Sequence, residues 1–172
     1  MKATTHTVLC MRRALVAVIV AVLTCANLTF SHAAIKEVKG STGQILTASA
    51  TSVKSGAVIT VKGKYFDESV GIYLGFCVTP KAGKSPTPCF GGINKDGIGD
   101  TSLWISSNPP PYGVGLAEEF MPGGRFIKKL TISKMIGKFD CKKVKCAITV
   151  RADHLRSEDR SFDLFIPITI KQ

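Results

Sequence analysis

The sequence predicts an all-β domain that folds as an antiparallel two-sheet sandwich of about seven strands. Short segments rich in β-branched and aromatic residues alternate with turns rich in Gly, Pro, Ser and Lys. After the apolar N-terminal run, no segment keeps the 3.6-residue period of an amphipathic helix. Two pairs of cysteines, Cys77 with Cys89 and Cys141 with Cys146, are spaced closely enough to fasten single turns onto a sheet.

The N-terminal residues have the pattern of an export signal. Basic residues precede an apolar run from Ala14 to Phe30, and small residues lead to a cleavage site after Ala33. Cys25 leaves lipid attachment open as an alternative, although Thr24 before it is a poor match to the small residue expected there. We expect a signal peptide at 1–33, a leading segment at 34–44 and the sandwich domain at 45–172. The apolar run is too short for a stable transmembrane anchor, so the protein should be secreted or held at the cell surface.

Each expected strand is a short run bounded by turn residues. The segments are 45–53, 58–62, 72–79, 101–106, 126–132, 147–150 and 162–170. The segment 72–79 is the clearest central strand, because its period-two pattern places Leu74 and Phe76 toward a core. Tyr73, Gly75 and Cys77 then lie on the opposite face, which should be shallower.

Four cysteines in the exported part of a chain imply two disulfides, for which three pairings are possible. Pairing Cys77 with Cys89 and Cys141 with Cys146 requires the least long-range closure. A zinc site is the rival interpretation. The cysteine spacings are not of the CxxC type, and His154 is the only histidine after the signal peptide, so we expect no metal.

Positive charge is concentrated in residues 121–150, where Asp140 is the only acid. Because a disulfide would pin the turn between Cys141 and Cys146, its lysines cannot all fold inward, and a basic patch should form. Its expected members are Lys128, Lys134, Lys138, Lys142, Lys143 and Lys145. Such a patch favours an anionic cell-envelope polymer or another surface protein as partner. The alternative is a solvated face that keeps the protein soluble. Nucleic acid is not expected, because no aromatic residues are interleaved with the lysines.

No catalytic motif accompanies His154, the one candidate base. The segment 151–163 is interpreted as a loop in which arginines satisfy acids through salt bridges. A Ser–His–Asp arrangement stays open as an alternative, whereas a calcium site lacks the required spacing. The sequence therefore predicts a protein that is not an enzyme, with no catalytic residues and no cofactor.

The motifs GAVITVKGKYF, GIYLGFC and DC-x4-C before a strand resemble the neocarzinostatin-type immunoglobulin-like fold, with the two disulfides in matching places. The patterns WISSNPP, PGGRF and RADH also resemble secreted actinobacterial modules found beside heme-transport-associated domains. The resemblance implies a cleft for a small apolar ligand, chromophore-like or heme-like. Its face would carry Tyr73, Gly75, Cys77, Cys89, Ala147, Thr149 and Arg151. Tyr73 and Arg151 are larger than such a cleft requires, and Arg151 is expected to stack on Tyr73.

Overall fold

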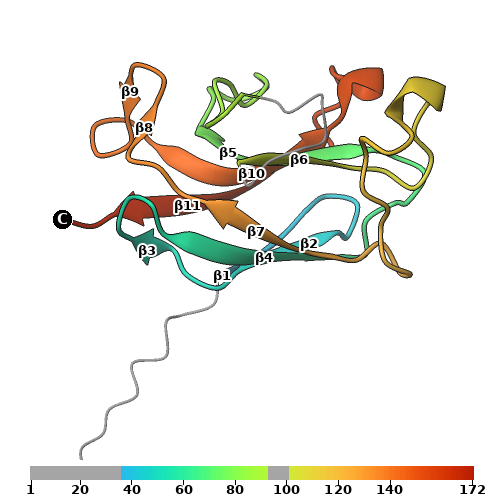
Figure 1. The fold of residues 1–172 in the computed structure, drawn as a ribbon, viewed down its shortest axis with the longest axis horizontal. Helices are drawn as coiled ribbons and strands as arrows, with labels where there is room; N and C mark the ends of the chain where they lie inside the picture. Colours follow the sequence, from blue (N-terminus) through green and yellow to red (C-terminus); the bar gives the residue numbers. More distant parts are fainter. Residues whose placement is uncertain (1–35, 93–100) are drawn as a thin grey trace, which may run out of the picture. The chain divides into compact units, whose positions relative to one another are not determined.

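The computed structural model describes residues 36–92 and 101–172 (Figure 1). The chain divides into two units, 1–32 and 33–172, and every described residue belongs to the second. The expected signal peptide, 1–33, lies outside the described residues. Within the described ranges, no helix is long and apolar enough to cross a membrane.

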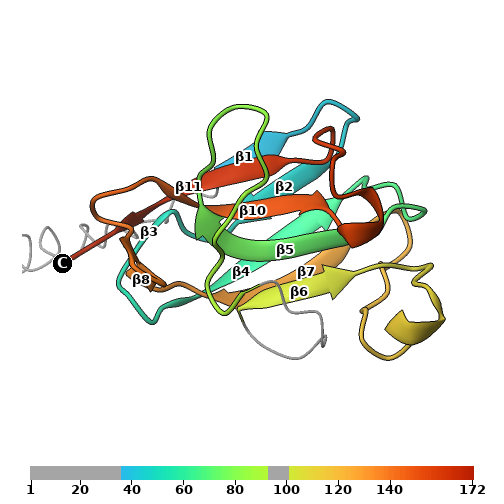
Figure 2. The same cartoon turned by 90° about the horizontal axis from the view of Figure 1, so that it is seen from above.

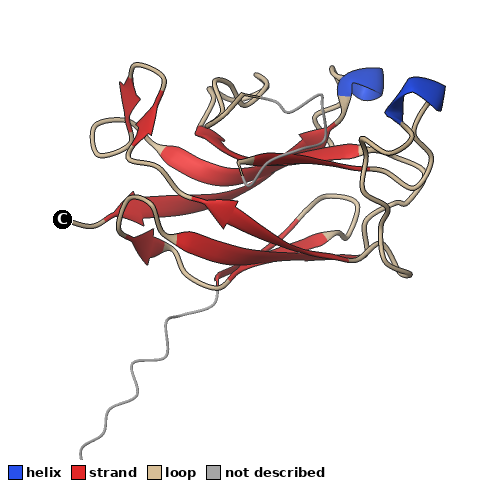
Figure 3. Ribbon diagram, viewed as in Figure 1, coloured by secondary structure: helices blue, strands red, loops and turns tan. Residues whose placement is uncertain are grey.

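The described chain is an antiparallel sandwich of two facing sheets, which confirms the predicted fold class (Figures 1 and 3). One sheet has four strands in the order β1–β2–β4–β7, and the other has five in the order β3–β11–β10–β5–β6. Their bounds are β1 Lys36–Lys39, β2 Ile45–Ala48, β3 Ser52–Val53, β4 Val58–Lys64, β5 Ile72–Val78, β6 Ser102–Ile105, β7 Phe126–Thr131, β10 Cys146–Ala152 and β11 Leu164–Ile170. A small hairpin, β8 Met135–Ile136 with β9 Phe139–Asp140, precedes the second disulfide.

The N-terminal part of the sandwich differs from the expectation. Residues 36–39, expected in a leading segment, form β1 and pair with β2. The single strand expected at 45–53 is divided into β2 and β3, which belong to different sheets. The Ser49 hydroxyl accepts a hydrogen bond from the Thr60 amide at the end of the β2 ladder, and the chain then crosses to pair in parallel with β11. A bend of this kind lets one segment serve both layers of a sandwich.

The core lies between the two sheets and is built from alternate residues of each strand. On β5, Ile72, Leu74 and Phe76 are buried in it, as the period-two pattern predicted. Tyr73, Gly75 and Cys77 therefore face the outer side of the five-stranded sheet.

Both disulfides follow the local pairing, Cys77–Cys89 and Cys141–Cys146. The first fastens the segment 88–90 beside the end of β5, where the Val78 amide donates to the Pro88 carbonyl. The loop between these cysteines crosses the outer side of β10 and β11 (Figure 2). Disulfides form in oxidising compartments, so the two bonds support export.

Candidate functional site

Three side chains lie in a row across the outer face of the five-stranded sheet. Antiparallel register pairs Tyr73 of β5 with Arg151 of β10 on one side and with Trp104 of β6 on the other. Directly paired residues in adjacent strands point to the same face. The row therefore brings together residues from three strands that are distant in sequence.

Two short 3-10 helices add further groups at the end of this row. The helix η2, His154–Arg156, follows β10 directly, and η1, Pro111–Gly113, carries Tyr112. The Asp153 carboxylate caps η2 by accepting the Leu155 amide at 3.0 Å. This cap fixes the chain where β10 ends, so that His154 lies beside Tyr73.

His154 is hydrogen-bonded on both ring nitrogens to tyrosine hydroxyls. The Tyr73 hydroxyl lies 2.6 Å from Nδ1, and the Tyr112 hydroxyl lies 2.7 Å from Nε2. The ring of His154 also meets the edge of Trp104, with centroids 5.0 Å apart. The result is a connected chain, Tyr73–His154–Tyr112, that runs from the buried sheet face to the surface.

The Trp104 ring is hydrogen-bonded to a buried carboxylate. Its indole nitrogen donates to Asp153 Oδ2 at 2.9 Å, and Asp153 is almost completely buried. Two glycines leave room for this pair. A Cβ on Gly71 would lie 2.0 Å from Asp153 Oδ2, and one on Gly113 would lie 2.4 Å from the Trp104 ring.

Tyr73, Trp104, Tyr112 and His154 line a hollow of about 270 Å³, which we call the aromatic hollow. Tyr73 and Trp104 are each only 2% exposed, whereas Tyr112 is 62% exposed. The floor is therefore rigid and buried, and the rim is accessible. Such a hollow can hold a small ring or apolar group against flat aromatic surfaces, with tyrosine and histidine as polar partners.

Burial raises the pKa of Tyr73 to about 12, and the negative charge of Asp153 adds to the effect. Tyr73 is therefore protonated at neutral pH. Its one hydrogen-bond partner among the described residues is His154, so its hydroxyl donates to Nδ1, because a buried donor left unpaired is costly. A neutral His154 then carries its proton on Nε2 and donates to Tyr112.

The Arg151 guanidinium carbon lies 5.3 Å from the centre of the Tyr73 ring, which confirms the expected stacking. Burial and the nearby Arg160 lower the pKa of Arg151. Among the described residues, its buried Nε has no hydrogen-bond partner. Arg151 therefore covers the side of Tyr73 where the cleft was expected.

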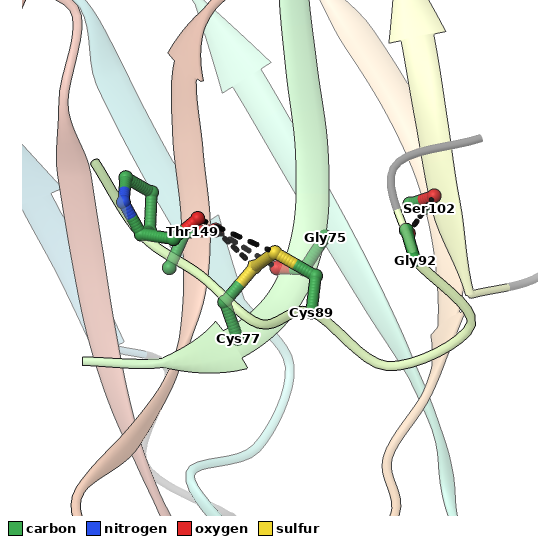
Figure 4. The surroundings of a disulfide bond; sticks show 7 residues. Gly75, Cys77, Cys89, Gly92, Ser102 and Thr149 are labelled. Atoms are coloured by element: carbon green, nitrogen blue, oxygen red, sulfur yellow. Dashed lines mark hydrogen bonds between the residues drawn. A yellow bond between two sulfur atoms is a disulfide. The ribbon is translucent and has the colours of Figure 1, made fainter. Parts of the chain in front are cut away.

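The other predicted cleft residues lie on the same face, but they are buried. Cys77, Cys89, Ala147 and Thr149 are all shielded from solvent, and register pairs Gly75 with Thr149. The Thr149 hydroxyl lies 3.0 Å from Cys77 Sγ and 3.4 Å from the Gly75 carbonyl (Figure 4). These groups contact one another, and the aromatic hollow lies beyond them at the end of the face.

The predicted basic residues divide into two groups. Lys128 forms an ion pair with Glu118, and Lys134 lies 3.4 Å from the Asp140 carboxylate. Lys138, Lys142, Lys143 and Lys145 are exposed, and none pairs with an acid of the described chain. Among the predicted patch residues, those in and beside the turn closed by Cys141–Cys146 are therefore unpaired with acids, while Lys128 is neutralised by Glu118.

The acidic loop forms fewer salt bridges than expected. Arg160 contacts Asp163 at 3.2 Å, as expected, whereas Asp153 is bonded by Trp104 and the Leu155 amide. Because both nitrogens of His154 are occupied by tyrosines, it is not arranged as the base of a Ser–His–Asp triad. Within the described ranges, no three side chains of His, Cys, Asp or Glu gather as a metal site.

Sequence reasoning missed the aromatic hollow as a unit. Of its four residues, only Tyr73 was placed at the predicted cleft, and His154 was considered only as a candidate base. Trp104 stood out as the sole tryptophan and His154 as the sole histidine after the signal peptide. The signal available in the sequence was Trp104, a rare and large side chain near a Pro-Pro-Pro loop. The contacts within the aromatic hollow, however, depend on register between distant strands.

No protein-family model matches the chain, and no curated protein sequence matches it significantly. A solved structure named macromomycin matches 75% of this chain and 100% of its own, at 13% identity and a TM-score of 0.47.

Proposed function

We propose that this protein is a secreted, non-enzymatic binding module that holds a small, largely aromatic or apolar ligand in the aromatic hollow. The proposal rests on the residues that line the aromatic hollow. Four ring side chains surround about 270 Å³, and two of them are fixed by burial in the sheet. Preformed, mostly apolar hollows with few polar groups are typical of small-molecule sites.

The hydrogen-bond pattern supports binding rather than catalysis. A general base needs a free nitrogen within reach of a substrate proton. Both ring nitrogens of His154 are hydrogen-bonded to tyrosine hydroxyls, so the ring serves to order the rim.

The test uses Trp104, the only tryptophan in the chain, as a reporter inside the site. Protein purified from its secreting host is examined by absorbance and native mass spectrometry for a bound compound. The ligand-free protein is then titrated with 2-naphthol and related small aromatic compounds while Trp104 emission is followed. We expect saturable quenching that is weakened in Tyr112→Ala.

Tyr65→Ala is the matched control, because Tyr65 is similarly exposed, at 65%, and does not line the hollow. If no compound is retained and no titration changes Trp104 emission, the proposal is wrong. Equal effects of the two alanine variants would likewise show that the hollow is not the site.

A second candidate function is weak attachment to anionic envelope polymers. It is favoured by the four exposed lysines on and beside the disulfide-closed turn, which a short covalent loop keeps facing outward. Charge-driven attachment should fall steeply between 0.1 M and 1 M salt, where the Debye length shrinks from about 10 Å to about 3 Å.

The test is sedimentation with cell walls at both salt concentrations. The triple variant Lys142→Glu/Lys143→Glu/Lys145→Glu should lose retention at low salt. Lys54→Glu/Lys81→Glu/Lys84→Glu changes the charge equally at other exposed positions and should bind like the wild type. If retention is unchanged by salt and by both triple variants, this function is excluded.

A further inference from the structure

The outer face of the four-stranded sheet carries a second hollow, whereas the aromatic hollow lies on the five-stranded sheet. It is a groove of about 250 Å³ whose apolar lining includes Ile45, Met121 and Ile127. Lys62, Lys64 and Arg125 also line it. We call this site the basic groove.

Strand register explains why apolar and basic side chains alternate there. Lys62 pairs with Ile127 of β7, and Lys64 pairs with Ile45 of β2. Since Lys62 and Lys64 are two positions apart on β4, both point away from the core. Ile127 is 54% exposed, which is a large exposure for a β-branched residue in a sheet.

The charges around the groove are not neutralised. None of Lys62, Lys64 and Arg125 forms an ion pair with an acid in the described part of the chain. Arg125 is oriented by donating from Nε to the Pro122 carbonyl at 2.8 Å. By strand register, Lys39 and Lys129 point to the same face of the sheet as the groove. Glu37 is the acidic residue of the strands on that face.

The spread of these cations indicates a partner with several negative charges. Lys39 on β1 and Lys129 on β7 are separated by three strand intervals across the sheet, or about 14 Å, and by four positions along the strands, or about 13 Å. A single small anion cannot contact charges that far apart. A polyanion without apolar groups would leave the apolar lining of the groove unused.

We propose that the basic groove binds an acidic protein segment, which inserts one bulky apolar side chain into the groove. Its carboxylates then lie against Lys62, Lys64 and Arg125. Concavity favours a protein segment over a membrane surface, because a membrane is entered by protruding apolar side chains and a groove receives them. An apolar anchor in a pocket, surrounded by complementary charge, is the usual form of a protein-recognition site.

The experiment selects partners from a phage-displayed library of random 12-residue peptides, using the disulfide-bonded protein as bait. The enriched peptides are synthesised, and their affinities are measured by fluorescence anisotropy. We expect them to combine several acidic residues with one Leu, Ile, Met or Phe. The variant Lys62→Glu/Lys64→Glu should weaken their binding about tenfold or more, and so should Ile127→Ser.

Each variant has a matched control. Lys142→Glu/Lys143→Glu makes the same change in charge at the disulfide-closed turn. Val58→Ser removes an equally exposed β-branched residue, at 59%, from the same sheet face. Both controls should bind the peptides like the wild type. Trp104 emission and thermal melting verify that all four variants are folded.

Three results would overturn the proposal. The library could yield no specific peptide, or its peptides could lack acidic residues, or they could bind the groove variants as tightly as the controls. Sedimentation with phosphatidylglycerol vesicles is run in parallel. Vesicle binding that depends on Lys62 and Lys64, in the absence of any selected peptide, would assign the face to a membrane surface instead.

Discussion

Tyr73 is the side chain on which the aromatic hollow depends, and its ionisation gives the first prediction. Its pKa of about 12 lies above the ordinary value of 10.0. An unfolded chain would therefore release this proton first, so the stabilising contribution is complete below pH 10 and is lost as the pH rises toward 12. In an ultraviolet titration, one of the three tyrosines should ionise late. Tyr73→Phe should remove that late transition, whereas Tyr65→Phe should leave it in place.

The pKa of Asp163 is predicted to shift upward on folding, whereas that of most carboxylates shifts downward. Burial raises its pKa to about 6, although Arg160 and Arg151 act to lower it. The native state thus holds this proton more tightly than the unfolded chain does. The contribution is complete below pH 3.8 and is lost as the pH rises through 6.

Asp163→Asn should therefore melt at a temperature less dependent on pH between 4 and 7 than the wild type. Calorimetry at both ends of that range measures the difference. Glu158→Gln, at an exposed position, serves as the control. If the melting temperatures of Asp163→Asn and the wild type depend on pH in the same way, the Asp163 side chain is ionised throughout that pH range.

The contact between η1 and β6 requires a glycine. Gly113 is buried against Trp104, and an added Cβ would lie 2.4 Å from the indole ring. Gly113→Ala should displace the loop that carries Tyr112, shift Trp104 emission to longer wavelength and cost about 1–3 kcal/mol of stability. Fluorescence and chemical denaturation measure both effects. Unchanged emission would mean that the loop gives way without disturbing the hollow.

The two disulfides should contribute unequally to stability. Their cysteines are separated by 12 and 5 positions. In the chain-entropy description, loops of these lengths stabilise by about 3 and about 2 kcal/mol. The double variant Cys77→Ala/Cys89→Ala should accordingly melt at a lower temperature than Cys141→Ala/Cys146→Ala. Equal melting temperatures, measured by calorimetry, would show that factors other than loop length decide how much each disulfide stabilises the protein.

Period-two patterns predicted which residues of β5 face the core, because successive side chains along a strand point to opposite faces of the sheet. The same patterns carry no information on which strands become neighbours. Tyr73 and His154 are 81 positions apart, and Trp104 and Asp153 are 49 apart. The local disulfides could be predicted because the cysteines are close in sequence. The aromatic hollow could not, because the pairing of β5 with both β10 and β6 creates it.

The division of residues 45–53 between two sheets was missed for a related reason. Both halves have strand-forming composition, and the crossing at Ser49 depends on a hydrogen bond to Thr60 of another strand. The basic groove was overlooked because its cations, Lys62, Lys64 and Arg125, are dispersed along the sequence. The sequence instead drew attention to the contiguous lysines before β10, of which Lys128 and Lys134 are paired with acids.

The place of β11 in its sheet has a consequence for how the protein is made. It is the last strand to be synthesised, yet it lies between β10 and β3 rather than at an edge. Until β11 leaves the ribosome, β10 has an unpaired edge and β3 has no partner in its layer. Completion of the five-stranded sheet therefore waits until β11 has been synthesised.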